Sequence, residues 1–254
     1  KEFNVWEKHR KVIKIVLPAY NEEEAILPLI TDIKRILGER FKAFEVIVVN
    51  DGSTDNTAKI VSELNIPMLK LVEHTRNKGL GESIKTGLLY SLKNSDENDI
   101  IVTMDADNTH SPGLIHRMSA FIEEGNDVVI ASRYRPGARV IGLTLARKII
   151  SFGGNMLFRL LFPTRGVKDY TSGYRAYRAG VLSRAFELWE NSFINEPGFS
   201  CQVDILLKLR KMRVIMNEVP LILRYDQKEG ASKMNVTSTM IDTLKLVVKR
   251  LVGI

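Results

Sequence analysis

Short apolar segments alternate with longer amphipathic segments through the first 131 residues of this 254-residue chain. Each short segment is rich in Val and Ile, which is typical of strands buried on both faces. The predicted strands cover residues 12–17, 44–49, 68–72, 100–104 and 128–131, and predicted helices cover about 26–37, 80–92 and 112–124. This alternation predicts βαβ units and a parallel sheet, with the carboxyl ends of the strands at one edge.

The alternation stops after residue 132. Residues 139–162 are rich in large apolar side chains but carry several basic ones, so we expect one or two amphipathic helices that either pack on the core or lie on a membrane surface beside a lipid site. Further predicted elements are helices at 179–188 and 202–211, a strand at 214–219, a polar loop at 224–235 and a helix at 237–252. The last helix is basic and amphipathic, which favours either a membrane surface or docking on the domain.

The composition narrows the possible partners. The net charge of +7 and the pI of about 9.4 point to phosphates, an anionic membrane surface or nucleic acid. The sequence has no helix-turn-helix pattern, zinc-ligand spacing or aromatic RNA-binding strand, so we expect no nucleic-acid partner. The single cysteine, Cys201, excludes an intrachain disulfide and fits a reducing compartment. We find no signal peptide and no run of 18 apolar residues, and therefore expect no segment that crosses a bilayer.

The predicted strand at 100–104 ends in two carboxylates, Asp105 and Asp107, separated by one small residue. Side chains two apart in an extended segment point to the same side, so both face one crevice at the carboxyl edge of the sheet. Asp51 ends the strand at 44–49 and should meet them there. Such oxygen ligands suit Mg²⁺ or Mn²⁺, which bind few protein carboxylates together with substrate phosphates. We therefore expect a metal site for a diphosphate; the alternative is a solvated turn or a helix cap.

A set of motifs at the predicted strand ends carries a family resemblance. The motifs are Leu17-Pro18-Ala19-Tyr20-Asn21-Glu22-Glu23, Val49-Asn50-Asp51-Gly52-Ser53-Thr54-Asp55, Met104-Asp105-Ala106-Asp107 and Ala131-Ser132-Arg133-Tyr134. In this order they resemble family 2 glycosyltransferases of the GT-A fold. The resemblance narrows to dolichol-phosphate mannose synthases and related polyprenyl-phosphate glycosyltransferases through Arg147, Ser151, Ser172-Gly173-Tyr174-Arg175, Glu218-Val219-Pro220 and Gly230-Ala231-Ser232-Lys233.

The resemblance covers nearly the whole chain and implies an α/β fold of the GT-A type. It implies a Rossmann-like, mostly parallel central sheet with helices on both faces, followed by C-terminal amphipathic helices. We expect one domain over residues 1–254, because the sequence shows no repeat, low-complexity tract or linker. Within it, residues 1–135 are expected to bind the nucleotide sugar, and residues 136–254 to bind the acceptor through amphipathic interfacial helices.

The resemblance also implies roles for individual residues. Pro18, Tyr20, Glu22, Val49 and Asp51 match positions that hold the donor nucleoside; Asp105, Ala106 and Asp107 match the diphosphate and metal site; Arg133, Arg147 and Ser151 match positions that receive the lipid phosphate; and Lys233 matches a basic residue of a mobile loop that closes over the donor. Of these, Asp107, Arg133, Arg147 and Lys233 are the residues expected to act in catalysis.

Two positions depart from the family pattern. Thr109 stands where the family has a metal-site glutamine, and we expect it to bind the metal weakly or through water. Gln227 stands where the family has a loop arginine that contacts the donor, so a positive charge is missing there, which Arg224 or Lys228 would replace. Both changes weaken the assignment to GDP-mannose as the donor and leave the class intact.

The resemblance implies a metal-dependent inverting transferase that moves mannose or glucose from GDP-mannose or UDP-glucose to a polyprenyl or dolichyl phosphate. A phosphomonoester is largely dianionic at neutral pH and needs no strong base. A hydroxyl acceptor, on a glycan or glycolipid, would need one, and Asp169 is then the candidate. The expected location is the cytoplasmic membrane face, as a peripheral protein with a possible membrane-protein partner.

Other classes fit less well. A sugar-nucleotide pyrophosphorylase would need a Gly-rich opening loop with a basic residue, whereas the first strand here ends in Pro-Ala-Tyr-Asn-Glu. A P-loop kinase or ATPase would need G-x-x-x-x-G-K-[ST], which does not occur. An inactive, membrane-associated nucleotide-sugar-binding homologue remains the non-enzymatic alternative, and the intact pair of Asp105 and Asp107 argues against it.

Overall fold

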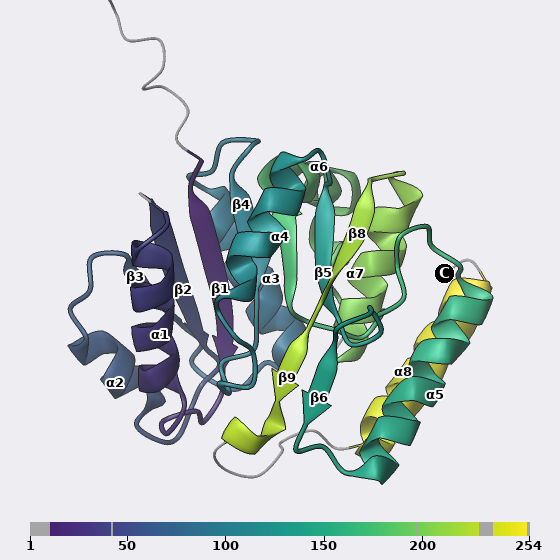
Figure 1. Cartoon of the computed structure of the whole chain (residues 1–254), viewed down its shortest axis with the longest axis horizontal. Helices are drawn as coiled ribbons and strands as arrows, with labels where there is room; N and C mark the ends of the chain where they lie inside the picture. The colour runs from purple at the N-terminus through teal and green to yellow at the C-terminus, as the bar shows by residue number, and fades with distance from the viewer. Residues whose placement is uncertain (1–10, 42, 197, 229–235, 253–254) are drawn as a thin grey trace, which may run out of the picture.

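The computed structural model describes residues 11–41, 43–196, 198–228 and 236–252. A central sheet of seven strands has the order β3-β2-β1-β4-β7-β5-β8 (Figure 1). These strands are β1 (Ile13–Ala19), β2 (Phe44–Asn50), β3 (Leu69–Glu73), β4 (Ile100–Thr103), β5 (Val128–Ser132), β7 (Arg175–Arg178) and β8 (Met216–Pro220). All neighbours pair in parallel except β7, which runs opposite to both β4 and β5. The predicted mostly parallel sheet is confirmed.

Helices cover both faces of this sheet, as expected. They are α1 (Ile26–Gly38), α2 (Thr57–Glu63), α3 (Leu80–Leu92), α4 (Leu114–Glu123), α5 (Leu145–Leu161), α6 (Ala179–Trp189), α7 (Ser200–Lys211) and α8 (Val236–Leu251), with short 3-10 turns η2 (Glu190–Ser192) and η3 (Tyr225–Gln227). One apolar core lies beneath α1, α2 and α4, and a second lies beneath α3, α6 and α7. The sheet is therefore buried on both sides, which explains its nearly unbroken Val and Ile runs.

Three short strands were not predicted. β7 follows the polar loop 169–174 and lies between β4 and β5. β6 (Arg139–Ile141) and β9 (Ile222–Arg224) pair in parallel outside the main sheet. Consequently the predicted helical stretch 139–162 is wrong at its start, where a strand precedes α5. None of these strands exceeds four residues, too few for an alternating or apolar pattern to stand out against a loop.

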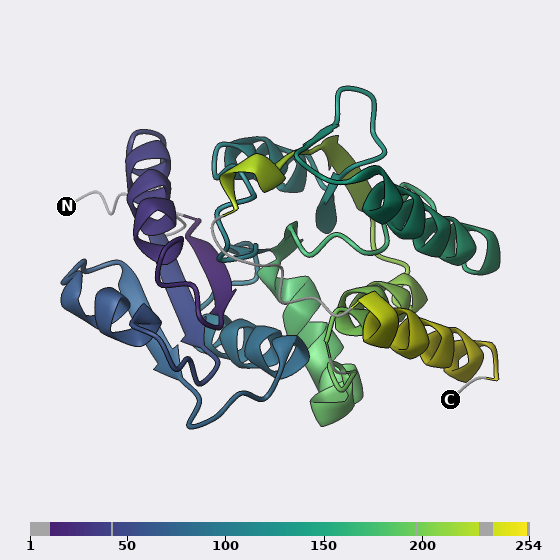
Figure 2. The same cartoon turned by 90° about the horizontal axis from the view of Figure 1, so that it is seen from below.

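α5 and α8 lie side by side at one end of the molecule in both views (Figures 1 and 2). Two basic residues of the last helix, Lys249 and Arg250, bind the domain. Lys249 Nζ lies 2.5 Å from Glu196 Oε1, and Arg250 Nε lies 2.8 Å from Asp204 Oδ1. The last helix is thus docked on α7 through Arg250 and on Glu196, which precedes α7, through Lys249.

Large apolar side chains remain exposed on these two helices. Leu145, Ile149, Phe152 and Leu160 of α5 and Leu244, Val248 and Leu251 of α8 are between 49 and 73% exposed. We call this set the apolar end surface. Among the described helices, none combines the length and the apolar character needed to cross a bilayer.

Candidate active site

The carboxyl edge of the sheet gathers the predicted polar residues. Asp51 follows β2, Asp105 follows β4 and Arg133 follows β5, and these three strands run in the same direction. Because β7 runs the opposite way, the residues that precede it come to this edge as well. The Thr103 hydroxyl donates a hydrogen bond to the Gly173 carbonyl at 2.7 Å, which ties the loop 169–174 to the end of β4. The antiparallel strand therefore adds a loop to the site.

The two carboxylates after β4 occupy different environments. Asp105 is half-buried and lines a pocket, whereas Asp107 is 9% exposed. The Thr109 hydroxyl donates to Asp107 Oδ1 at 2.7 Å, and the Lys228 ammonium lies 2.6 Å from Oδ2. Burial raises the pKa of Asp105. Burial acts in the same direction on Asp107, but its charged and hydrogen-bonding neighbours, chiefly the Lys228 ammonium, together outweigh burial and lower the pKa of Asp107 below its usual value.

The positive charge expected near Gln227 comes from Lys228. Gln227 itself is exposed, and Arg224 forms an ion pair with Asp226 at 2.8 Å. Lys228 instead reaches back to Asp107, 121 residues earlier in the chain. Lys233 lies outside the described residues, so its role stays a prediction.

The residues after β4 fit a divalent cation. Asp105 and Asp107 supply carboxylate oxygens and Thr109 supplies a hydroxyl, which are the hard ligands that Mg²⁺ and Mn²⁺ prefer. Within the described ranges no three His, Cys, Asp or Glu side chains cluster as a metal-binding group. The donor set therefore matches an ion that takes part of its coordination from a bound diphosphate.

His110 is a pocket residue that the sequence analysis did not select. Its ring stacks on Tyr174, with the centroids 4.9 Å apart, and its Nδ1 accepts the main-chain N–H of Asp105 at 3.3 Å. The contact holds the main chain of Asp105 in place. No spacing rule predicts this role, because Tyr174 lies 64 residues further along the chain.

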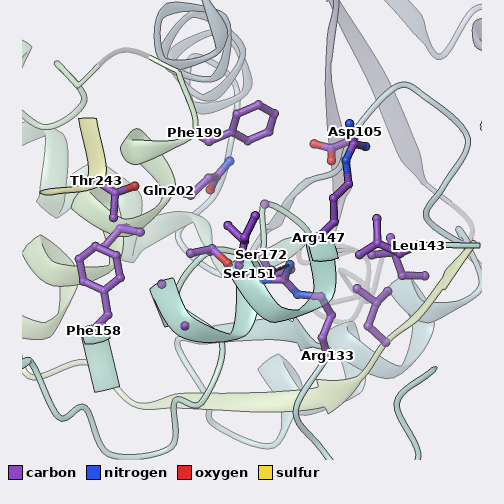
Figure 3. A pocket seen from close by; sticks show the side chains of 18 of the residues that line it. Asp105, Arg133, Leu143, Arg147, Ser151, Phe158, Ser172, Phe199, Gln202 and Thr243 are labelled. Carbon is purple, nitrogen blue, oxygen red and sulfur yellow. Dashed lines mark hydrogen bonds between the residues drawn. The ribbon is translucent and has the colours of Figure 1, made fainter. Parts of the chain in front are cut away.

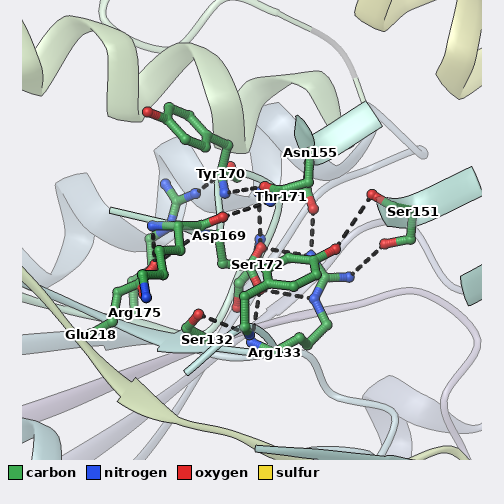
Figure 4. A network of polar contacts seen from close by, with 12 residues as sticks. Ser132, Arg133, Ser151, Asn155, Asp169, Tyr170, Thr171, Ser172, Arg175 and Glu218 are labelled. Atoms are coloured by element: carbon green, nitrogen blue, oxygen red, sulfur yellow. Dashed lines mark hydrogen bonds and ion pairs between the residues drawn. The ribbon is translucent and has the colours of Figure 1, made fainter. Parts of the chain in front are cut away.

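Arg133 is bound by a buried carboxylate, Asp169 (Figure 4). Its Nε and Nη2 lie 2.9 and 2.7 Å from the two oxygens of Asp169, whose side chain is fully buried. Nη2 also donates to the Thr171 hydroxyl at 2.5 Å, and Nη1 donates to the Ser151 hydroxyl at 3.1 Å. The predicted acceptor residues Arg133 and Ser151 are thus in direct contact.

Asp169 does not fit the role of general base. Although burial alone would raise the pKa of its carboxyl, the Arg133 guanidinium lowers that pKa below the usual range. Its Oδ1 also accepts the main-chain N–H of Ser172 at 3.1 Å. Glu218 and Asn155 hold the same loop by accepting the N–H groups of Asp169 and Tyr170, at 2.7 and 2.8 Å. The expectation for Asp169 is corrected: it orients Arg133.

A pocket of about 460 Å³ connects these groups (Figure 3). Asp105 and Thr109, two of the three candidate metal ligands, line it at one end, and Arg133, Arg147 and Ser151 line it from the end of β5 and from α5. It continues between α5, α7 and α8 along an apolar wall that includes Ile150, Leu157, Phe158 and Leu244. Arg147 has no hydrogen-bond or ion-pair partner in the described part of the chain, so its guanidinium is available to an anion.

The predicted nucleoside residues lie elsewhere along the edge. None of Pro18, Tyr20, Glu22, Val49 and Asp51 lines this pocket. The Val49 side chain is fully buried and packs against α3, and Ala106 is 3% exposed, so these two offer only their main chain to a ligand. Their assignment, like that of the other three, stays a prediction.

The carboxylate of Asp51 is held by hydrogen bonds to residues 74–79 of the chain. Its Oδ1 lies 2.7 Å from His74 Nδ1 and accepts the N–H of Lys78 at 2.9 Å, while Oδ2 accepts the N–H of Gly79 at 2.8 Å. The turn after β2 lies close to this segment: Gly52 has φ +67, and a Cβ there would stand 2.4 Å from the main chain of Arg76. A carboxylate offers about four acceptor positions, so room for one base contact remains.

The fold and the site together define an α/β protein with an acidic pair at the carboxyl edge of its sheet and two arginines in the adjoining pocket. The sequence model of glycosyl transferase family 2 matches residues 14–186. The chain belongs to this family and is a glycosyltransferase.

Curated relatives share about a third of their residues with this chain. They include a dolichol-phosphate mannosyltransferase of Pyrococcus furiosus, 32% identical over 82% of this chain and 55% of the relative. A polyprenol monophosphomannose synthase of Mycolicibacterium smegmatis is 31% identical over 87% of this chain and 80% of the relative. An undecaprenyl-phosphate mannosyltransferase of Micrococcus luteus is 30% identical over 87 and 86%. The chain thus spans just over half of the first relative and most of the other two.

Solved structures confirm the fold. The glucosyl-3-phosphoglycerate synthase of Mycobacterium tuberculosis, in complex with Mn²⁺, UDP and glucosyl-3-phosphoglycerate, matches with a TM-score of 0.66 over 95% of this chain and 79% of that one, at 20% identity. The same enzyme with Mg²⁺ and UDP matches with a TM-score of 0.65. At this identity the likeness establishes the GT-A-like fold alone.

Proposed function

We propose that this protein transfers mannose or glucose from a nucleotide sugar, GDP-mannose or UDP-glucose, to a polyprenyl or dolichyl phosphate. The observation that best supports this proposal is a single pocket. It joins Asp105 to Arg133 and to Arg147, which has no partner among the described residues, and it continues along an apolar wall. Such a pocket suits an acceptor with an anionic head and an apolar tail. The names of the three curated relatives support the same reaction and favour mannose.

On the donor side, the chain provides for the leaving diphosphate. Asp105 and Asp107 would hold Mg²⁺ or Mn²⁺, which supplies Lewis-acid stabilisation of the departing oxygen when bound. Lys228 lies beside Asp107 and brings a second positive charge to the same place. Because negative charge develops on the leaving group in the transition state, a fixed cation there lowers the barrier. Lys228 therefore supplies the positive charge that is missing at Gln227.

On the acceptor side, Arg147 binds the phosphate and Arg133 supports it. A guanidinium matches phosphate oxygens with paired hydrogen bonds. Arg133 is already neutralised by Asp169, so it contributes an oriented donor, and the net positive charge at this end comes from Arg147. The burial of Asp169 favours a phosphate acceptor over a hydroxyl one, because a dianionic phosphate attacks without a base. Direct attack inverts the anomeric carbon.

The apolar end surface supports the proposal that the acceptor enters from a membrane. α5 and α8 both line the pocket and both expose large apolar side chains. A peripheral attachment at the cytoplasmic face would deliver the lipid between them. Lys148 and Lys245 are exposed on the same helices and suit anionic headgroups.

The test is transfer of labelled sugar to a short polyprenyl phosphate with Mg²⁺ or Mn²⁺, with GDP-mannose and UDP-glucose compared. Lipid-linked product from either donor is expected. Arg147→Ala should raise the KM for the lipid about ten- to hundredfold, because a hydrogen bond to a charged group contributes about 1.5–3 kcal/mol. The KM for the donor should stay the same, and Arg159→Ala, on the same helix but outside the pocket lining, serves as control. Donor hydrolysis or a hydroxyl-linked product would reject the lipid phosphate, and binding without turnover would indicate an inactive homologue.

Membrane contact is tested separately with Val248→Asp. Val248 is 61% exposed on α8. Withdrawing a valine from an apolar phase costs about 1.5–3 kcal/mol, so binding to phosphatidylglycerol–phosphatidylcholine vesicles should weaken at least about tenfold. Leu27→Asp, on an exposed position of α1, should leave vesicle binding unchanged. Equal loss in both variants, or vesicle binding that neither variant affects, would contradict contact through the apolar end surface.

A further inference from the structure

Two buried polar atoms in the pocket lining have no partner among the described residues. They are Ser172 Oγ and Gln202 Oε1, and the residues are 6 and 2% exposed. An unsatisfied buried polar group costs about 1–3 kcal/mol. Most such groups in folded proteins are paired, so two of them in one pocket lining require a physical reason.

Hydrogen bonds hold the main chain of both residues in place. Gln202 lies in the first turn of α7, where its carbonyl accepts the guanidinium of Arg175 at 2.7 Å. Ser172 is held by Asp169, which accepts its main-chain N–H. A half-turn of the Gln202 amide, or rotation of Ser172 about χ1, changes which polar atom faces the pocket without moving the main chain. The unpaired atoms therefore sit on a rigid frame.

The segment Thr171 to Gly173 connects the acceptor end of the pocket to the donor end. Thr171 contacts Arg133. Gly173 lies at the opposite end, where a Cβ would stand 2.9 Å from Gln202 Nε2 and 3.5 Å from Asp105 Oδ1. Ser172 is between them, and Gln202 and Asp105 both line the pocket near Gly173 (Figure 3).

We propose that Ser172 and Gln202 form the subsite that binds the hydroxyl groups of the transferred hexose. The inference rests on the proposed function, because it places the sugar between the donor diphosphate at Asp105 and the acceptor phosphate at Arg133. In a direct displacement the anomeric carbon must lie between these two phosphates, which is where the Thr171 to Gly173 segment runs. A hydroxyl and an amide both donate and accept hydrogen bonds, as sugar hydroxyls do.

The absence of a side chain at Gly173 keeps this subsite open. A Cβ there would press on the Gln202 amide at less than the usual contact distance. Phe199, which lies near Gln202 in the pocket lining (Figure 3), offers apolar surface to a sugar ring. Because a site built to pair with hydroxyls leaves its own polar groups unpaired when the hydroxyl is missing, the subsite also discriminates between sugars.

The test compares nucleotide sugar with bare nucleotide in the full chain. Calorimetric titrations with Mg²⁺ use GDP-mannose and GDP, and UDP-glucose and UDP. We expect Gln202→Leu and Ser172→Ala each to weaken binding of the nucleotide sugar about tenfold or more while leaving the Kd for the nucleoside diphosphate unchanged. Lys211→Ala, an exposed residue at the end of the same helix and outside the pocket lining, should change neither. The ratio of the two Kd values within one variant is unaffected by partial unfolding, since unfolding weakens both equally.

The outcomes separate this inference from the proposed function. Equal weakening of both ligands would show that Ser172 and Gln202 only support the fold, and unchanged binding of both would place the sugar elsewhere; either result overturns the subsite. Wild-type protein that binds none of the four nucleotides would overturn the proposed function, and the subsite with it. A further outcome is that the wild type binds the nucleotides and transfers sugar to lipid while the variants keep the wild-type ratio of the two Kd values. That combination would reject the subsite alone.

Discussion

Asp105→Asn is expected to lower the rate of sugar transfer at least about hundredfold, the usual effect of removing one group that stabilises transition-state charge. Asp105 lines the pocket at the donor end, and the amide of Asn has nearly the same shape but no charge to hold a divalent cation. The measurement is the initial rate at saturating donor with Mg²⁺ or Mn²⁺, together with Mn²⁺ binding in the presence of the nucleoside diphosphate.

The matched control is Asp32→Asn, which removes the charge of a partly exposed carboxylate on α1 that forms an ion pair with Arg35. It should leave transfer and metal binding unchanged. A wild-type rate in Asp105→Asn would contradict the metal and diphosphate site. Loss of transfer with undiminished Mn²⁺ binding would assign Asp105 to the substrate instead of the metal.

Asp169→Ala is expected to lower the free energy of unfolding by about 3–5 kcal/mol, because removing one partner of a buried ion pair leaves the other charge uncompensated. Asp169 is fully buried and binds Arg133 through both carboxylate oxygens. Urea unfolding followed by circular dichroism measures the change. Asp226→Ala, which breaks the exposed pair with Arg224, should have little effect. A loss no larger than in this control would show that the buried pair contributes nothing to stability.

The same variant predicts a pH dependence. Arg133 keeps the pKa of Asp169 below its usual value in the folded protein. The stabilisation is therefore complete above the unfolded pKa of about 4 and is lost as the pH falls through the lower folded value. The difference in unfolding free energy between wild type and Asp169→Ala should be constant from pH 7 to about pH 5 and shrink at more acidic pH. A difference that instead grows on acidification would contradict the ion pair.

The local sequence pattern was sufficient to predict most of the strands and helices. The Val- and Ile-rich runs that form β1, β2, β4 and β5 were predicted within one or two residues, because strands buried on both faces have a composition that loops rarely show. The same reasoning placed Asp105 and Asp107 at the carboxyl edge. The helical periodicity of apolar residues in α7 and α8 was also recognisable, although it did not predict which elements pack against each face.

Long-range contacts determined the details of the site. Lys228 meets Asp107 across 121 residues, and Asp169 meets Arg133 across 36. No periodicity encodes such pairs. The role of Asp169 was therefore mistaken, and the docking of Lys249 and Arg250 on α7 and Glu196 was one of two open alternatives.

The order of residues alone thus specified the strands, the helices and the acidic edge, because backbone propensity and burial act on neighbours in the chain. Only the folded chain decided where β7 runs, which loop reaches the pocket and which charges are paired. Those outcomes depend on the desolvation of side chains brought together by the sheet order, and desolvation is a property of the assembled interior. Gln202 illustrates the difference: an ordinary helical residue in the sequence, it becomes a buried amide in the pocket lining next to Gly173 in the fold.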